Sequence, residues 1–207
     1  MTRATRIPLF PLDVVLLPGM RLPLHIFEPR YKQMIGLCLR EQLEFGLILA
    51  ATKAIATLGC TAAILEKTKD YPDGRMDILT EGRVVFRLNE LIDEKEYYEG
   101  DVEYVDDEPF APDPKLEARL IEAFHQSYAL ISGRQPVLDA EGEPATLSYR
   151  VAAQLPMELA KRQALLEMRS ESDRRKLVLG WITEILPKLM ETRRLRQRAG
   201  GNGHGPN

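Results

Sequence analysis

The segment from Asp106 to Pro114 most constrains the fold, because the sequence pattern differs on its two sides. Its nine residues include three prolines and four acids, a composition typical of a linker. Short extended patterns precede it and helical patterns follow it, so the chain does not alternate β and α units. We therefore predict an α+β fold. The predicted parts are a β-rich subdomain with one early helix at 1–108, an acidic Pro-rich linker at 109–115, a helical subdomain at 116–198 and a disordered tail at 199–207.

The first part reads as short strands separated by turn residues. The apolar run Val14–Leu17, the turn pair Pro18-Gly19 and the run Met20–Phe27 predict a strand, a turn and a second strand. Prolines at 8, 11, 18 and 23 place these strands at sheet edges or at breaks, because proline cannot donate to a ladder. Further strands are expected at Phe45–Ala50, Gly59–Lys67, Met76–Leu79, Arg83–Leu88 and Tyr97–Val105, with a break at Glu81-Gly82. The pattern favours a small, partly open β-barrel.

Helices are predicted where apolar residues recur every three or four positions. Glu28-Pro29 should open the early helix, because proline suits the first turn and an acid there favours the helix dipole. After the linker, one helix should end at Gly133 and two shorter ones are expected at Ser148–Leu155 and Met157–Met168. A Ser170-x-x-Asp173 cap should begin a long last helix, which Pro187 is expected to kink or restart.

The charge balance argues against general nucleic-acid binding. The net charge is −3, and residues 89–117 alone contribute −10. A solvated acidic face is the simpler interpretation of that segment, and attraction of basic partners is the alternative. The basic run Arg193–Arg198 lacks interleaved aromatic residues and fits a solvated helix end.

Several classes of function have no support in the residues. The longest uncharged stretch, Ala54–Leu65, has 12 residues, fewer than the roughly 20 needed to span a bilayer. The N-terminus lacks the apolar core of a signal peptide, so we expect a cytoplasmic protein that does not enter a membrane. No glycine precedes a lysine, which excludes a phosphate-binding loop of the Gly-Lys-Ser/Thr type. Cys38 and Cys60 lie in apolar stretches typical of reduced buried thiols, and with three histidines we predict neither a metal site nor a cofactor.

One tight polar cluster, His25, Glu28 and Arg30, interrupts an apolar run. An imidazole beside a carboxylate could serve a catalytic or small-molecule pocket. A structural role is the other interpretation, in which Glu28 and Arg30 form hydrogen bonds that hold the turn between strand and helix. In that case His25, Glu28, Pro29, Arg30 and Tyr31 together form a structural motif.

The chain carries a series of sequence blocks in a fixed order: Ile7-Pro8-Leu9-Phe10-Pro11-Leu12, Val15-Leu16-Leu17-Pro18-Gly19, Leu22-Pro23-Leu24-His25-Ile26-Phe27-Glu28-Pro29-Arg30-Tyr31, Phe45-Gly46, Gly59-Cys60-Thr61-Ala62, Asp73-Gly74-Arg75, Gly82-Arg83 and Val85-Phe86-Arg87. Together these blocks resemble the N-terminal, substrate-binding domain of Lon proteases. The resemblance covers about residues 6–196 and implies a PUA-like barrel followed by a helical bundle. Lon proteases continue into an ATPase and a peptidase module, and this chain is expected to lack both.

The resemblance implies a non-enzymatic protein, active in protein quality control, that binds exposed apolar segments of unfolded or client polypeptides. A proteolytic machine is a further implied partner. Binding would use an apolar groove or an open sheet edge, with Leu17, Met20, Leu22 and Leu24 as candidate contacts. Two alternatives stay open, an RNA-binding PUA-like protein and a small-molecule pocket near His25, Glu28 and Arg30.

Overall fold

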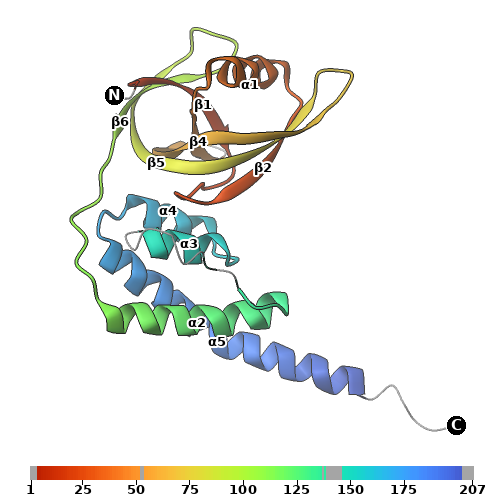
Figure 1. Cartoon of the computed structure of the whole chain (residues 1–207), viewed down its shortest axis with the longest axis vertical. Helices are drawn as coiled ribbons and strands as arrows, with labels where there is room; N and C mark the ends of the chain where they lie inside the picture. Colours follow the sequence, from red (N-terminus) through yellow and green to blue (C-terminus); the bar gives the residue numbers. More distant parts are fainter. Residues whose placement is uncertain (1–3, 52–53, 137, 139–145, 202–207) are drawn as a thin grey trace, which may run out of the picture. The chain divides into compact units, whose positions relative to one another are not determined.

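The computed structural model describes residues 4–51, 54–136, 138 and 146–201 (Figure 1). Its contacts divide the chain into two compact units. The first comprises Met1–Glu108 and Pro156–Arg169, and the second comprises Pro109–Leu155 and Ser170–Asn207. Strands occur in the first unit and helices dominate the second, which confirms the α+β prediction. Pro156–Arg169 groups with the first unit, although the sequence pattern assigned it to the helical subdomain.

The first unit is a six-stranded sheet that closes on itself. Its strands are β1 (Arg6–Leu12), β2 (Arg21–Ile26), β3 (Phe45–Ala51), β4 (Ala54–Asp70), β5 (Met76–Ile92) and β6 (Glu99–Tyr104). Their order is β2-β5-β4-β3-β1-β6, and β5 also pairs with β6. Five strands therefore form a ring, and β2 extends it as an outer strand on β5, as in a partly open barrel.

Two predicted features of these strands are wrong. The run Val14–Leu17 is not a strand, because the first strand is β1 and the chain turns after Leu17, where the Met20 amide donates to the Leu17 carbonyl at 2.9 Å. The run is apolar because Val15, Leu16 and Leu17 are buried as irregular chain. The expected break at Glu81-Gly82 is absent, since β5 continues through it. Gly82 serves close packing there, because a Cβ at this position would lie 2.2 Å from the Leu17 carbonyl oxygen.

The sheet buries apolar side chains on both faces near β1. Ile7 and Leu9 join a cluster with Ile48, Phe86 and Val102. On the alternate face of β1, Phe10 stacks on Tyr31 of helix α1 (Pro29–Glu41) with ring centroids 4.0 Å apart. Helix α1 begins at Pro29, as predicted, and buries Tyr31, Met34, Ile35 and Cys38. It lies in the connection between β2 and β3 (Figure 1).

Helix α4 (Leu159–Glu167) belongs to the first unit by its contacts with β4. The Gln163 side-chain amide donates to the Leu58 carbonyl at 3.2 Å. Beyond the helix, Arg169 donates to the Val105 carbonyl at 3.4 Å and lies 3.6 Å from the Asp107 carboxylate. These polar contacts hold residues 163–169 against β4 and against the segment that follows β6.

The second unit contains α2 (Pro114–Ser132), α3 (Leu147–Ala153) and α5 (Glu171–Gly201). The Asp113 carboxylate caps α2 by accepting from the amides of Lys115 and Leu116. Gly133 ends the helix at φ 70°, as the sequence predicted. The cap of α5 is also confirmed, because the Asp173 amide donates to the Ser170 hydroxyl at 3.3 Å.

Helix α5 runs through Pro187 without restarting, which corrects that part of the prediction. Of the expected tail, residues 199–201 lie in this helix and residues 202–207 lie outside the described residues. The only tryptophan, Trp181, is buried in α5. None of the helices in the described part of the chain combines the length and the apolar character needed to cross a membrane.

A buried ion-pair cluster joins α3 and α5 within the second unit. The Glu171 carboxylate accepts from the Ser148 amide and hydroxyl, from Arg174 at 3.0 and 3.1 Å, and from Arg175 at 2.8 Å. The three charged side chains are at most 1% exposed. Arg174 also stacks on the Tyr149 ring at 4.2 Å. Such a cluster fixes the relative position of the two helices, because each buried charge depends on its partners.

Candidate functional site

The four predicted contact residues divide into one buried and three partly exposed side chains. Leu17 is fully buried, so it belongs to the core and we remove it from the candidate surface. Met20, Leu22 and Leu24 are partly exposed, at and beside the outer strand β2. The exposed part of the candidate surface is therefore β2 and the turn before it.

Strand pairing places Leu22 on the same sheet face as Ile64. Leu22 pairs with Thr80 of β5, and Thr80 pairs with Ile64 of β4. Directly paired residues share a face, so these three side chains form one row across the sheet. Leu22 and Ile64 are two strand spacings apart, about 10 Å. The predicted contact Leu22 therefore lies in the same row as a pocket on β4.

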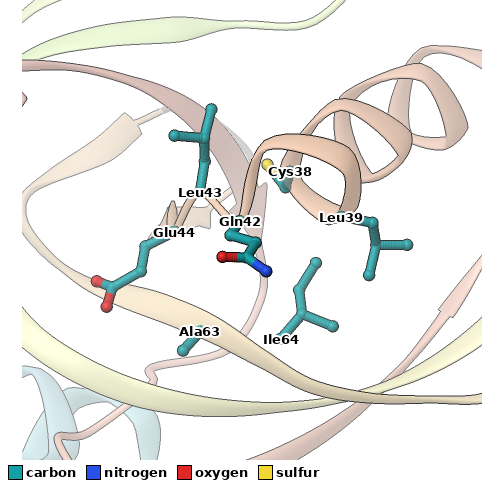
Figure 2. Close-up of a pocket in the computed structure, with 7 residues that line it drawn as sticks. All are labelled: Cys38, Leu39, Gln42, Leu43, Glu44, Ala63 and Ile64. Carbon is teal, nitrogen blue, oxygen red and sulfur yellow. The ribbon is translucent and has the colours of Figure 1, made fainter.

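This pocket, which we call the α1–β4 pocket, has a volume of about 350 Å³ (Figure 2). Its apolar lining comes from Cys38 and Leu39 of α1 and from Ala63 and Ile64 of β4. The segment 42–44, which connects α1 to β3, supplies the remaining lining residues Gln42, Leu43 and Glu44. The volume is at the lower end of the range of about 300–1,000 Å³ for ligand sites. No sequence motif indicates this pocket, because its lining residues come from the end of α1, from the segment after it and from β4.

Two strand edges near the candidate contacts and the α1–β4 pocket have no paired neighbour among the described residues, and neither is a good template for an added strand. β2 pairs only with β5, and it carries Pro23 at its centre. Beyond Ala62, β4 has β5 on one side only, and its pairing is irregular between Ile64 and Glu66 and between Lys67 and Lys69. Proline, bulges and lysines on edges all oppose strand addition. These two edges therefore offer no regular row of backbone donors and acceptors for an added strand.

The structure separates the polar cluster predicted around His25 into two pairs. His25 Nδ1 lies 2.5 Å from Asp77 Oδ1, and the Tyr71 hydroxyl donates to Asp77 Oδ2 at 2.9 Å. These hydrogen bonds from His25 and Tyr71 hold the pKa of the Asp77 carboxyl below its ordinary value of 3.8. Glu28 instead accepts from Arg30, at 2.9 Å from Nε. His25 therefore has a carboxylate partner other than Glu28.

The pair Glu28 and Arg30 lies at the start of α1. Glu28 is the N-cap residue, Pro29 follows at the first helical position, and the Arg30 guanidinium lies 4.6 Å from the centre of the Tyr31 ring. The carboxylate and the guanidinium are each about 40% exposed on their side chains. These contacts are all local to the first turn of α1, and the Glu28 side chain forms no capping hydrogen bond to the helix.

Sequence reasoning did not single out Phe27, which is 59% exposed. Its ring stacks on His25 at 6.0 Å, and the edge of Tyr71 contacts His25 at 5.7 Å. The alternation along β2 carried a usable signal, since His25 and Phe27 are two residues apart and must share a face. By the same alternation, His25 and Phe27 lie on the face opposite to Leu22 and Leu24, so this exposed ring does not extend the surface of the candidate contacts.

The two thiols are unsuited to nucleophilic chemistry. Burial raises the pKa of Cys38 to about 11, and burial also raises the pKa of Cys60 well above its usual range. Within the described residues, no three His, Cys, Asp or Glu side chains are grouped so that they could hold a metal ion.

A strand ring with an outer strand and one packed helix, followed by further helices, defines a class of domain seen in solved structures. The crystal structure of a Lon N-terminal domain protein from Xanthomonas campestris is similar, with a TM-score of 0.66 and 26% identity over 86% of this chain and 99% of that one. The N-terminal domain of a Lon protease from the Mycobacterium avium complex shares the fold, with a TM-score of 0.63 at 15% identity.

The family model for the ATP-dependent protease La (LON) substrate-binding domain matches residues 6–184. The chain therefore belongs to the Lon substrate-binding domain family, as its sequence blocks predicted. It is 30% identical over 200 residues to Lon protease 1 of Hydrogenovibrio crunogenus and 29% identical over 212 residues to Lon protease of Escherichia coli strain K12. The matches cover 90% and 93% of this chain, but 24% and 26% of those relatives. The chain spans about a quarter of the curated relatives it matches.

Proposed function

We propose that this chain binds polypeptides that expose apolar segments, such as unfolded or client proteins, without itself performing chemistry. The observation that carries the proposal is the match of residues 6–184 to a domain described as substrate-binding in an ATP-dependent protease. The relatives are named as proteases, so their substrates are polypeptides. The matched region corresponds to about a quarter of their length. The match therefore supports the recognition of polypeptide substrates by this chain.

We place the binding surface on the side of the barrel that carries β2. Met20, Leu22 and Leu24 offer partly exposed apolar groups on this strand and in the turn before it. An apolar surface of this kind gains free energy with any segment that buries apolar area against it, at about 25 cal/mol per Å². Such binding depends little on the exact sequence of the segment, which suits the recognition of unfolded chains.

We favour binding in a groove over strand addition because of the edges of the sheet. In an antiparallel ladder, residues alternate between pairs that exchange hydrogen bonds and pairs whose amides point outward. The Gly82 amide donates to the Met20 carbonyl, so this carbonyl points toward β5, and an even alternation along β2 then directs the backbone groups of Pro23 outward. The outward edge of β2 therefore lacks a donor at its centre, because proline has no N–H.

A binding titration tests this proposal. A fluorescently labelled, reduced and permanently unfolded model polypeptide is titrated with the protein, and its anisotropy is compared with that of the same polypeptide in its native form. We expect saturable binding of the unfolded form and a much weaker response to the native form. Absence of binding to both forms would overturn the proposal.

A matched pair of variants locates the surface. Met20→Ser removes a partly exposed apolar side chain beside β2, and Met190→Ser makes the same change at a 45% exposed position in α5. We expect Met20→Ser to weaken binding of the unfolded polypeptide several-fold and Met190→Ser to leave it unchanged. An equal effect of both substitutions would contradict the placement on the barrel.

A further inference from the structure

The α1–β4 pocket has a polar rim whose side chains lack partners in the described structure. Figure 2 shows the Gln42 amide directed toward Ala63 and Ile64, and the Glu44 carboxylate at the opposite side of the pocket from Leu39. Among the described residues, no hydrogen bond or ion pair is formed by either side chain. Both residues are exposed, so their polar groups face solvent and are available to a ligand.

Gln42 adopts a backbone conformation that its residue type disfavours. It ends α1 in the left-handed region, at φ 54° and ψ 41°, and it is the only residue other than glycine with a positive φ in the described part of the chain. Glycine and asparagine are the usual residues at such a position. A residue retained against its backbone preference commonly serves a functional site. The strained position directs its amide into the pocket.

Glu44 gives the pocket a charge preference. Its neighbours in the pocket lining are apolar or neutral, so the carboxylate is the only formal charge among the residues that line it. Figure 2 shows this carboxylate across the pocket from Leu39 and Ile64, so a ligand that fills the pocket from their side would reach the negative charge with its next residue. The complementary ligand is an apolar side chain with a cation beside it.

We propose that the α1–β4 pocket binds one apolar side chain of a bound polypeptide and selects segments in which a lysine or arginine is adjacent to that side chain. The apolar group lies between Leu39 and Ile64, the Gln42 amide pairs with the peptide backbone, and Glu44 pairs with the cation. This inference rests on the proposed function and specifies its sequence preference.

The test uses two labelled peptides that share one leucine-rich core and differ only in flanking residues, lysine in one and glutamate in the other. Anisotropy titrations of the wild-type protein should give about 2- to 5-fold tighter binding of the lysine peptide, the size expected for one exposed ion pair. Glu44→Lys should reverse the preference. Glu41→Lys is the matched control, because Glu41 is an exposed acid three residues away that does not line the pocket.

Two further variants separate the pocket from general electrostatics. Ile64→Trp enlarges a side chain that Figure 2 shows directed from β4 toward α1, so it should fill the pocket and weaken both peptides by about tenfold or more. Gln42→Gly suits the left-handed backbone, so the protein stays folded, and the loss of the amide should weaken both peptides without altering the preference for lysine.

The outcomes distinguish this inference from the proposed function. Binding of the unfolded polypeptide with no preference between the peptides, or an equal response to Glu44→Lys and Glu41→Lys, would overturn the pocket assignment and leave the proposed function standing. Absence of any binding to the unfolded polypeptide would overturn the proposed function and this inference with it.

Discussion

Replacing Glu171 by glutamine keeps the size of a buried side chain and removes the charge on which two buried arginines depend. Oε1 of Glu171 accepts from the Ser148 amide and from Arg175 Nε, and Oε2 accepts from the Ser148 hydroxyl and from two nitrogens of Arg174. A glutamine must place its NH₂ group at one of these two positions. In either orientation, it brings a donor against at least two nitrogen donors.

The expected loss is large because these groups are buried. Breaking a buried ion pair by removing one partner costs about 3–5 kcal/mol. Arg175 keeps its contact with Glu117 at 3.0 Å, whereas the ion pair between Arg174 and Glu171 is lost. Domains of this kind are stable by about 5–15 kcal/mol, so the loss is a major fraction of the total. With a urea dependence of about 1–3 kcal/mol/M, the unfolding midpoint of the helical unit should fall by at least about 1 M.

The assay is urea unfolding followed by the fluorescence of Trp181, the only tryptophan, which lies in the same unit. Asp173→Asn is the matched control, because it makes the same chemical change two residues away, where the ion pair with Lys176 is exposed. Asp173→Asn should shift the midpoint little. Equal midpoints for Glu171→Gln and Asp173→Asn would refute the argument that burial makes this cluster important for stability.

Three other predictions concern the barrel. Gly82→Ala should destabilise the barrel by about 1–3 kcal/mol, because the new Cβ would meet the Leu17 carbonyl oxygen at 2.2 Å. A denaturation midpoint of this variant equal to that of the wild type would refute the close contact. Leu17→Ala should cost about 2–5 kcal/mol in urea unfolding, since the side chain is fully buried; a loss of affinity for unfolded polypeptide with unchanged stability would contradict this. Burial raises the pKa of Glu99, but hydrogen bonds from Lys95 and Arg6 outweigh burial and lower the pKa below 4.5. The stability that these hydrogen bonds contribute is therefore complete above 4.5 and is lost as the pH falls through the lower pKa of the folded state. Melting temperatures at decreasing pH should therefore converge for the wild type and Glu99→Gln, and a constant difference would show that the carboxylate contributes no pH-dependent stability.

Local signals were enough to predict several helix ends. Pro29, Gly133 and Ser170 each act through their immediate neighbours, and the structure shows the corresponding start, end and cap. A proline at the first turn or a glycine with positive φ requires no distant partner. These elements were therefore predictable from spacing alone.

Features that depend on distant partners were not predictable in the same way. Val14–Leu17 has the composition of a strand, but its burial follows from close approach to Gly82, 65 residues after Leu17. Glu171 lies within a correctly predicted cap, and charged residues in a first turn are ordinarily solvated. The spacing of Glu171, Arg174 and Arg175 was compatible with ion pairs on one face. Their burial became visible only with Ser148 of α3 in place.

The sequence blocks that relate this chain to its family include residues with packing roles. A Cβ on Gly46 would lie 2.6 Å from Leu9 and 2.9 Å from Phe86, and one on Gly59 would lie 2.5 Å from Phe86. Larger residues at these positions would displace the core of the barrel. These glycines therefore explain why the blocks predicted the fold.

Gln42 and Glu44 differ from these glycines, because the packing of the barrel does not require them. Both are exposed, and Gln42 adopts a backbone conformation that glycine would adopt with less strain. Neither residue belongs to the blocks that carried the resemblance. Residues that the fold does not require are free to differ in a way that sets the preference for a ligand. For this reason we expect substitutions at 42 and 44 to change which polypeptides are bound, whereas substitutions at 46, 59 and 82 should change whether the barrel folds.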